Sequence, residues 1–185
     1  MNQIKITLLT IAVLLCSISA RAQNFEVDGI YYKVLSREKL TAEVTYKRYY
    51  NGNYENDYSG AVIIPSTVTY DSKTYSVMSI GDHAFEGCSS LTSITMPEGV
   101  TSIGNNAFYN CSSLTNITIP ESVTSIGSSA FWGCSSLTSI TIPEGVISIG
   151  NNAFNGCRSL TNITIPESVT SIGFNPFKGT AWLNN

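Results

Sequence analysis

The sequence has a single histidine and few charged residues. His83 is the only histidine among 185 residues, and charged residues make up 12% of the chain. Sites that need two imidazoles, or a nucleophile activated by a histidine, therefore lack a component unless His83 serves alone. From residue 74 onward only Arg158 and Lys178 are basic, which argues against a nucleic acid partner, because phosphate binding needs clustered cations. We predict no catalytic site.

The sequence also lacks an apolar run long enough to cross a membrane. The longest run extends from Ile6 to Ala20, and it is shorter than the roughly 20 residues that a spanning helix needs. Ala20-Arg21-Ala22 follows, a small-residue pattern typical of signal peptide cleavage. We expect residues 1–22 to be a signal peptide and the mature chain to be exported without a transmembrane segment. It would be secreted or held at the cell surface, with the periplasm as an alternative.

The dominant feature that is present is a repeat of 23 residues. Ile-Gly pairs recur with this step at 80–81, 103–104, 126–127, 149–150 and 172–173. Within one repeat, Ile94 and Met96 alternate with Ser93 and Thr95, which is the period of a short strand with one buried face. A proline ends the strand in successive repeats, because proline cannot donate to a strand ladder. These prolines are Pro65, Pro97, Pro120, Pro143 and Pro166.

A single repeat cannot be stable alone. Its few inward-facing side chains bury too little apolar surface to offset the conformational entropy of ordering its backbone. Successive repeats must therefore stack in parallel, about 4.8 Å apart. The glycine after each isoleucine is expected to permit a tight bend into a one-turn helix. The predicted fold class is an α/β repeat solenoid, with a parallel β-sheet on one face and short helical or irregular turns on the other.

The two ends of the chain depart from the repeat. Residues 23–58 alternate aromatic and polar residues, and we expect them to form an N-terminal β cap over the open edge of the first coil. The solenoid of 23-residue repeats is predicted to span residues 59–183, followed by a C-terminal end at 184–185. Pro176 and Thr180 replace the alanine and cysteine of earlier repeats, so the last coil is expected to be incomplete.

The repeated pattern Leu-x-x-Ile-x-Ile-Pro-x-x-Val-x-x-Ile-Gly-x-x-Ala-Phe-x-x-Cys resembles the leucine-rich repeats of BspA-like bacterial surface proteins. The resemblance covers about residues 60–183, and the leader and the segment 25–32 are also similar to the usual opening of such proteins. It implies a right-handed curved solenoid with a parallel sheet on one face. It also implies a surface or secreted adhesin that binds host matrix proteins or other cells, but it assigns no residues to that role.

Outward positions of the predicted strands form a candidate partner-binding surface. They give a flat, uncharged face of hydroxyls and amides that can hydrogen-bond a protein or a glycan, although such side chains can equally form ladders that stabilise the sheet. Tyr109 and Trp132 share one repeat position, and they either add an aromatic patch or fill a gap between repeats. The full candidate set is Ser93, Thr95, Asn116, Thr118, Ser139, Thr141, Asn162, Thr164, Tyr109 and Trp132.

Two further columns of repeated residues have a chemical and a structural interpretation. One cysteine per repeat occupies an inward position, so we expect buried free thiols and no disulfides. The sulfurs would lie along a line, whereas the ligands of a zinc ion must converge on one point. One glutamate per repeat follows the proline, and we interpret this row as solvated turn acids because no Asp-rich calcium loop accompanies it. We predict no cofactor and no metal. The residues are Cys88, Cys111, Cys134 and Cys157, and Glu98, Glu121, Glu144 and Glu167.

These observations favour an exported leucine-rich binding module that engages a protein, on host matrix or on a microbial surface, or a glycan. Two alternatives remain: a structural spacer, and an accessory carbohydrate-binding protein suggested by asparagine, threonine and aromatic residues on the surface.

Overall fold

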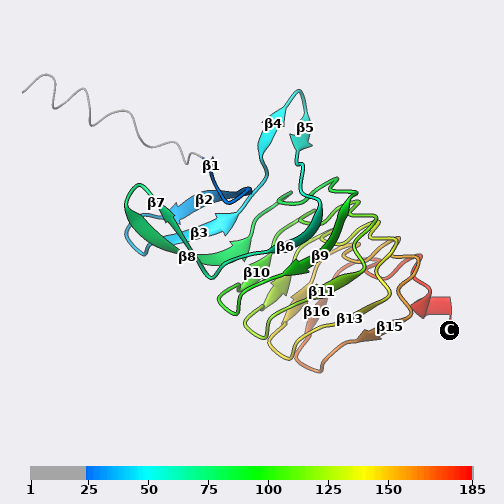
Figure 1. The fold of residues 1–185 in the computed structure, drawn as a ribbon. Helices are drawn as coiled ribbons and strands as arrows, with labels where there is room; N and C mark the ends of the chain where they lie inside the picture. Colours follow the sequence, from blue (N-terminus) through cyan, green and yellow to red (C-terminus); the bar gives the residue numbers. More distant parts are fainter. Residues whose placement is uncertain (1–23, 185) are drawn as a thin grey trace, which may run out of the picture.

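The computed structural model describes residues 24–184, so the signal-peptide prediction for residues 1–22 lies outside the described residues. The described part of the chain begins with a group of paired strands and continues as a stack of coils, with the C-terminus at the far end of the stack (Figure 1). The strands that precede the regular coils are β1 (Asn24–Val27), β2 (Ile30–Ser36), β3 (Thr41–Val44), β4 (Arg48–Tyr50), β5 (Asn53–Glu55), β6 (Gly60–Ile63), β7 (Thr67–Tyr70) and β8 (Lys73–Ile80).

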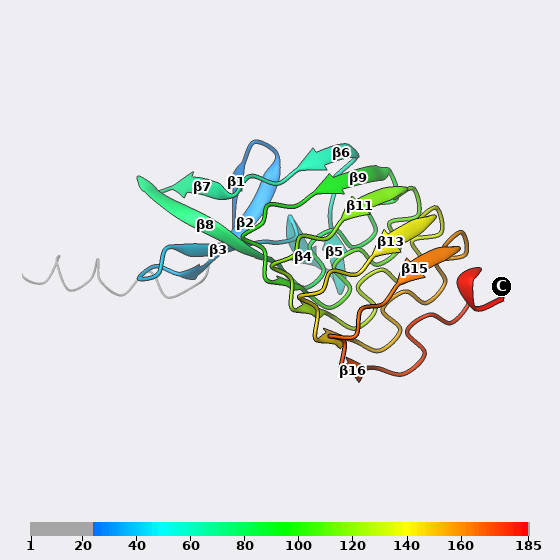
Figure 2. The same ribbon diagram turned by 90° about the horizontal axis from the view of Figure 1, so that it is seen from below.

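Each regular coil contains two short strands. Those of the first kind, which we name the Thr strands because each ends in threonine, lie side by side in both ribbon views (Figure 2). They are β9 (Leu91–Thr95), β11 (Asn116–Thr118), β13 (Ser139–Thr141) and β15 (Asn162–Thr164). The second kind, the Ser strands, each consist of Ser-Ile. They are β10 (Ser102–Ile103), β12 (Ser125–Ile126), β14 (Ser148–Ile149) and β16 (Ser171–Ile172).

The coils stack in register, as the repeat predicts. All four Ser strands pair in parallel with partners one repeat away, for example Ile103 with both Ile80 and Ile126. The Thr strands are also parallel, with Ile94 opposite Ile117 and Ile140 opposite Ile163, but they form two separate sheets, β6-β9-β11 and β13-β15. The coil therefore has a parallel sheet on two of its sides, whereas one sheet face was predicted.

A column of stacked phenylalanine rings occupies the interior. The rings of Phe85, Phe108, Phe131 and Phe154 follow one another with centroids 5.1 Å apart, and Phe177 continues the column at 5.6 Å. The first four are fully buried. Because each repeat places the same residue at the same point of the coil, the core grows by adding identical layers.

The helical bends expected after each Ile-Gly pair are not present. Within residues 24–184 the only helix is the 3-10 turn η1 (Trp182–Asn184). Two residues of every bend have positive φ, for example His83 (60°) and Gly87 (74°), a conformation that a right-handed helix excludes. Alternate backbone amides of the bend also donate hydrogen bonds to the next coil and not within their own coil. For example, Phe85 N donates to Ala107 O of the next coil at 2.7 Å. The fold is a β-rich repeat and not α/β.

The glycines of the Ile-Gly pairs permit close contact between coils and do not form the bend itself. A Cβ atom on Gly127 would lie 2.6 Å from the carbonyl carbon of Gly104, and one on Gly150 would lie 2.4 Å from Ser128 N. Separations this short leave no room for a side chain. Their φ angles are not positive, so glycine is required at these positions by the close approach of the coils and not, as predicted, by a tight bend.

The N-terminal strands cover one edge of the stack. β1, β2 and β3 form an antiparallel meander, and β3 then pairs in parallel with β8, so the sheet of Ser strands continues as β1-β2-β3-β8-β10-β12-β14-β16. β6 is left as the outer strand of its own sheet. β1, β2 and β3 lie within the segment 23–58 for which a β cap is predicted, whereas β6 and β8 lie after it.

We expect Gly127→Ala to lower the free energy of unfolding by about 3 kcal/mol, because the added methyl group forces neighbouring coils apart. Urea denaturation followed by circular dichroism measures this loss. Gly99→Ala is the matched control, since its Cβ would lie 3.3 Å from Val77 O and should cost less than about 1 kcal/mol. Equal losses in the two variants would contradict the close-contact explanation.

Candidate functional site

Eight of the ten candidate residues lie on one surface, the outward side of the Thr strands, which we name the Thr face. All are exposed except Ser93, which is half-buried. Tyr109 and Trp132 lie elsewhere, in the bends between a Ser strand and the next Thr strand. Their rings are half-buried and stack on each other at 4.7 Å and 8°, so they bridge two coils and do not extend the Thr face.

Hydroxyls that stabilise the stack are found next to the Thr face and not on it. Thr115 Oγ1 donates to Thr92 O at 3.2 Å, and Ser122 Oγ donates to Val100 O at 2.6 Å, each bonding the preceding coil. On the Thr face, within residues 24–184, no side chain bonds the preceding coil, and the one side-chain hydrogen bond is from Asn162 Nδ2 to Oγ1 of the adjacent Thr161, at 3.4 Å. The hydroxyl ladder that would make this face purely structural is therefore not formed.

Sequence reasoning did not identify a second surface, which lies along the Ser strands. A groove of about 480 Å³ runs across four coils there. Its base is formed by the Ile-Gly glycines, which lack side chains, and serine hydroxyls border it. The repeated serine before each Ile-Gly pair was the available signal. These residues are Ser102, Ser125, Ser148 and Ser171, with Gly104, Gly127, Gly150 and Gly173.

A second cavity of about 490 Å³ lies where the cap meets the first coil. Lys33 and Glu43 border it and are bonded to each other, Nζ to Oε1, at 3.1 Å. Asp82, Tyr46 and Tyr54 also line it. None of these residues recurs in a pattern, so only the folded chain brings them together.

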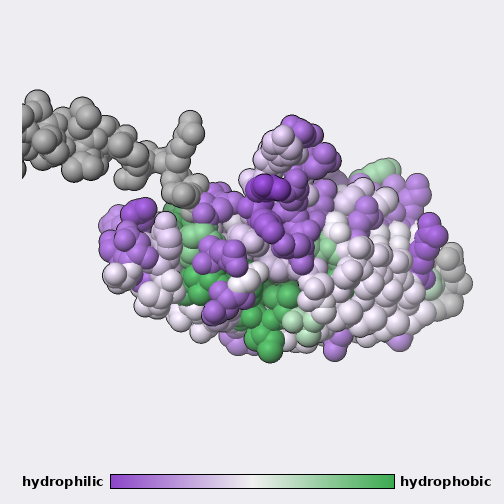
Figure 3. Space-filling model, turned by 45° about the horizontal axis from the view of Figure 1, so that its top comes forward, coloured by the Kyte–Doolittle hydropathy of each residue, from purple (hydrophilic) through white to green (hydrophobic). Residues whose placement is uncertain are grey.

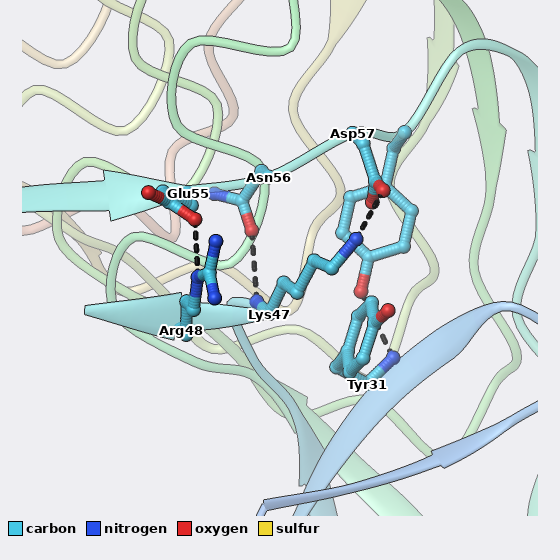
Figure 4. Close-up of polar contacts among 7 residues, drawn as sticks. Tyr31, Lys47, Arg48, Glu55, Asn56 and Asp57 are labelled. Atoms are coloured by element: carbon cyan, nitrogen blue, oxygen red, sulfur yellow. Dashed lines mark hydrogen bonds and ion pairs between the residues drawn. The ribbon is translucent and has the colours of Figure 1, made fainter. Parts of the chain in front are cut away.

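A hairpin arm, β4–β5, projects beside this cavity and is visible as a hydrophilic extension of the surface (Figure 3). Asn51 and Gly52 form its turn, both with positive φ, as a tight two-residue hairpin turn requires. Lys47 bonds Asp57 at 2.5 Å and Arg48 pairs with Glu55, so the cations of the arm are matched by carboxylates (Figure 4). The bond to Asp57 raises the pKa of Lys47.

The arm is fixed to the first coil at its base. Tyr54 stacks on His83 with centroids 3.8 Å apart, and Asn56 Nδ2 donates to the carbonyl oxygens of His83 and Glu86, each at 3.1 Å. Burial and the neighbouring Tyr46 and Tyr49 raise the pKa of Tyr54. His83 is thus a half-buried stacking partner in a bend, paired with Glu86.

The cysteines of the coils are buried free thiols. Cys111 Sγ donates to Phe85 O at 3.1 Å, and Cys134 and Cys157 donate to the equivalent carbonyls of their preceding coils. Burial raises the pKa of Cys88 to about 12, and it also raises the pKa of Cys111 and Cys134. Among residues 24–184, no three or more His, Cys, Asp or Glu side chains are grouped to hold a metal ion.

We expect these thiols to resist alkylation in the folded protein. The pKa of Cys88 rises from 9.0 to about 12, so at mildly alkaline pH its thiolate fraction is roughly a thousand-fold smaller than that of a thiol with the unshifted value. Iodoacetamide treatment followed by mass spectrometry of the four cysteine peptides should show modification only after guanidinium denaturation. Rapid alkylation of the native protein would contradict this packing.

Within residues 24–184, no helix has the length and apolar content needed to cross a membrane. The fold is similar to those of several solved bacterial proteins. A leucine-rich repeat protein from Bacteroides ovatus is 44% identical with a TM-score of 0.72, covering 83% of this chain and 38% of that one. A leucine-rich cell surface protein from Faecalibacterium prausnitzii is 33% identical with a TM-score of 0.62, covering 87% and 47%.

The pneumococcal vaccine antigen PcpA shares the fold at 20% identity, with a TM-score of 0.63 over 88% of this chain and 49% of that one. The chain thus spans less than half the length of each of these three structures. No protein of curated function matches the sequence. The BspA type leucine-rich repeat region matches in six copies over residues 50–184, which is most of the chain. The protein therefore belongs to the BspA-type leucine-rich repeat family.

Proposed function

We propose that the protein is an exported binding module that engages a protein partner, on host matrix or on a microbial surface, through the Thr face. Family membership supports the binding role, because leucine-rich repeat domains commonly bind proteins. The Faecalibacterium prausnitzii relative is described as a cell surface protein, which supports export and an adhesin role for this chain. The apolar run at residues 6–20 is consistent with a leader.

The observation that most supports the Thr face is its unused hydrogen-bonding capacity. Thr95, Asn116 and Thr118 are exposed and make no side-chain hydrogen bond within residues 24–184. In contrast, the hydroxyls of the nearby Thr115 and Ser122 donate to carbonyl oxygens of the preceding coil. Polar groups that the fold does not use remain available to a partner. The face has no charged residue at these positions, so it suits a partner surface with amides and hydroxyls and not one that requires strong electrostatic attraction.

The test uses the triple variant Asn116→Ala, Thr118→Ala, Ser139→Ala. Each lost hydrogen bond costs about 0.5–1.5 kcal/mol, so affinity for the partner should fall roughly ten-fold to a thousand-fold. Surface plasmon resonance against a panel of immobilised matrix proteins identifies the partner and measures this loss.

The matched control is Ser89→Ala, Ser159→Ala, Thr170→Ala, which removes three exposed hydroxyls outside the Thr face. It should leave affinity unchanged. Equal weakening by both triple variants would show that the Thr face is not the binding surface. Absence of binding to every matrix protein and to intact bacterial cells would instead favour the spacer role.

A further inference from the structure

The groove along the Ser strands and the cavity beneath the cap adjoin each other, because Ser102 and Gly104 line both. We name the two together the cleft. We propose that this cleft is a second binding site, separate from the Thr face, and that it takes a linear uncharged glycan whose end lies in the cavity and whose following residues lie along the groove.

The base of the groove is a necessary consequence of coil stacking. Side chains at Gly104, Gly127 and Gly150 are excluded because their Cβ atoms would lie 2.4–2.6 Å from backbone atoms of the preceding coil. The backbone of the preceding coil occupies the position of each missing Cβ, so only glycine fits there and the base of the groove is bare backbone. The groove extends along four coils, a shape suited to an extended polymer.

The sides of the groove present hydrogen-bonding groups that the fold leaves free. The hydroxyls of Ser102, Ser125 and Ser148 make no hydrogen bond within the described part of the chain. Asn105 Oδ1 accepts from Ser128 N at 2.9 Å, which orients the amide and leaves its Nδ2 available to donate. Serine hydroxyls both donate and accept, as sugar hydroxyls do, so the two surfaces are chemically complementary.

The groups of the groove recur at the spacing of the coils. The stacked phenylalanine rings place successive coils about 5.1 Å apart, so a serine and a glycine return at that interval. A ligand made of repeated, similar units can meet the same contacts in each coil, whereas a ligand with varied side chains cannot. This periodicity favours a homopolymer.

The cavity offers donors and acceptors together with aromatic rings. Lys33 Nζ and Glu43 Oε1 form an ion pair at 3.1 Å. Asp82 Oδ1 accepts a hydrogen bond from Asn105 N at 2.6 Å. These bonds orient the three charged side chains before any ligand binds. Tyr46 and Tyr54 contact each other at 4.8 Å on the same lining. Aromatic rings combine an apolar surface with a polar tip, which matches the apolar C–H surface and hydroxyls of a sugar ring.

The same features disfavour other polymers. Among residues 24–184, Lys33 is the only lysine or arginine that lines the cavity or the groove, so these residues offer little positive charge to phosphate backbones or acidic glycans. An extended peptide docks on an open strand edge or through apolar pockets, but β12 and β14 are paired on both edges. The isoleucines of the Ser strands that line the groove, such as Ile126, are buried in the core.

The test is calorimetric titration of the full chain with linear hexasaccharides of glucose, xylose and mannose. Ser125 and Ser148 are half-buried at the groove, so the double variant Ser125→Leu, Ser148→Leu places bulky side chains in it. This variant should lower the affinity for whichever hexasaccharide binds by at least about ten-fold. Tyr46→Ala, in the cavity, should weaken the same ligand by a similar factor. Because Tyr46 lies in the cavity and not in the groove, Tyr46→Ala still tests the proposal if the double leucine variant does not fold.

The Thr-face triple variant is the matched control and should bind the hexasaccharide as the unaltered protein does. The leucine pair should in turn leave binding to a matrix protein unchanged, so failure of one site is distinguishable from failure of the other. The proposal is overturned if no hexasaccharide binds at millimolar concentration, or if both groove and cavity variants bind normally. It is also overturned if an uncharged serine-glycine hexapeptide competes with equal affinity.

Discussion

Stacking of equal coils in register is the interaction on which the whole structure depends. An isolated coil leaves many of its backbone amides and carbonyls without partners, and the neighbouring coils satisfy these groups. Bonds such as Thr124 N to Thr101 O at 2.9 Å join positions one repeat apart. Because every layer must meet an identical layer, a change in repeat length would displace the phenylalanine, isoleucine and cysteine columns at the same time.

The surfaces follow from the same constraint. At the Ile-Gly pairs the coils lie too close for a side chain, so bare backbone forms the base of the groove along the Ser strands. Where the coils are less crowded, at the Thr strands, hydroxyl and amide side chains project freely. One protein thus has two polar surfaces of different shape, a flat one and a hollow one, on two sides of the same stack.

The cap solves a problem that stacking creates. A terminal coil exposes unpaired strand edges, which promote aggregation, and β3 removes one of them by pairing with β8. The cap also places Lys33, Glu43 and Tyr46 beside the first coil and so closes one end of the groove. Covering an edge and forming a cavity are therefore two results of the same pairing.

The sequence by itself determined the repeat, the buried columns, the exposed Thr face and the family, because 23-residue periodicity and alternation directly report which side chains face inward. It did not determine the bends: asparagine and glycine favour positive φ, but the sequence offers several of them, and hydrogen bonds to the next coil accompany the positive φ of Asn106 and Asn110. Nor could it place Tyr109 and Trp132 off the Thr face, or bring Glu43 near Asp82. Those relations join residues distant in sequence, and only the tertiary packing sets them.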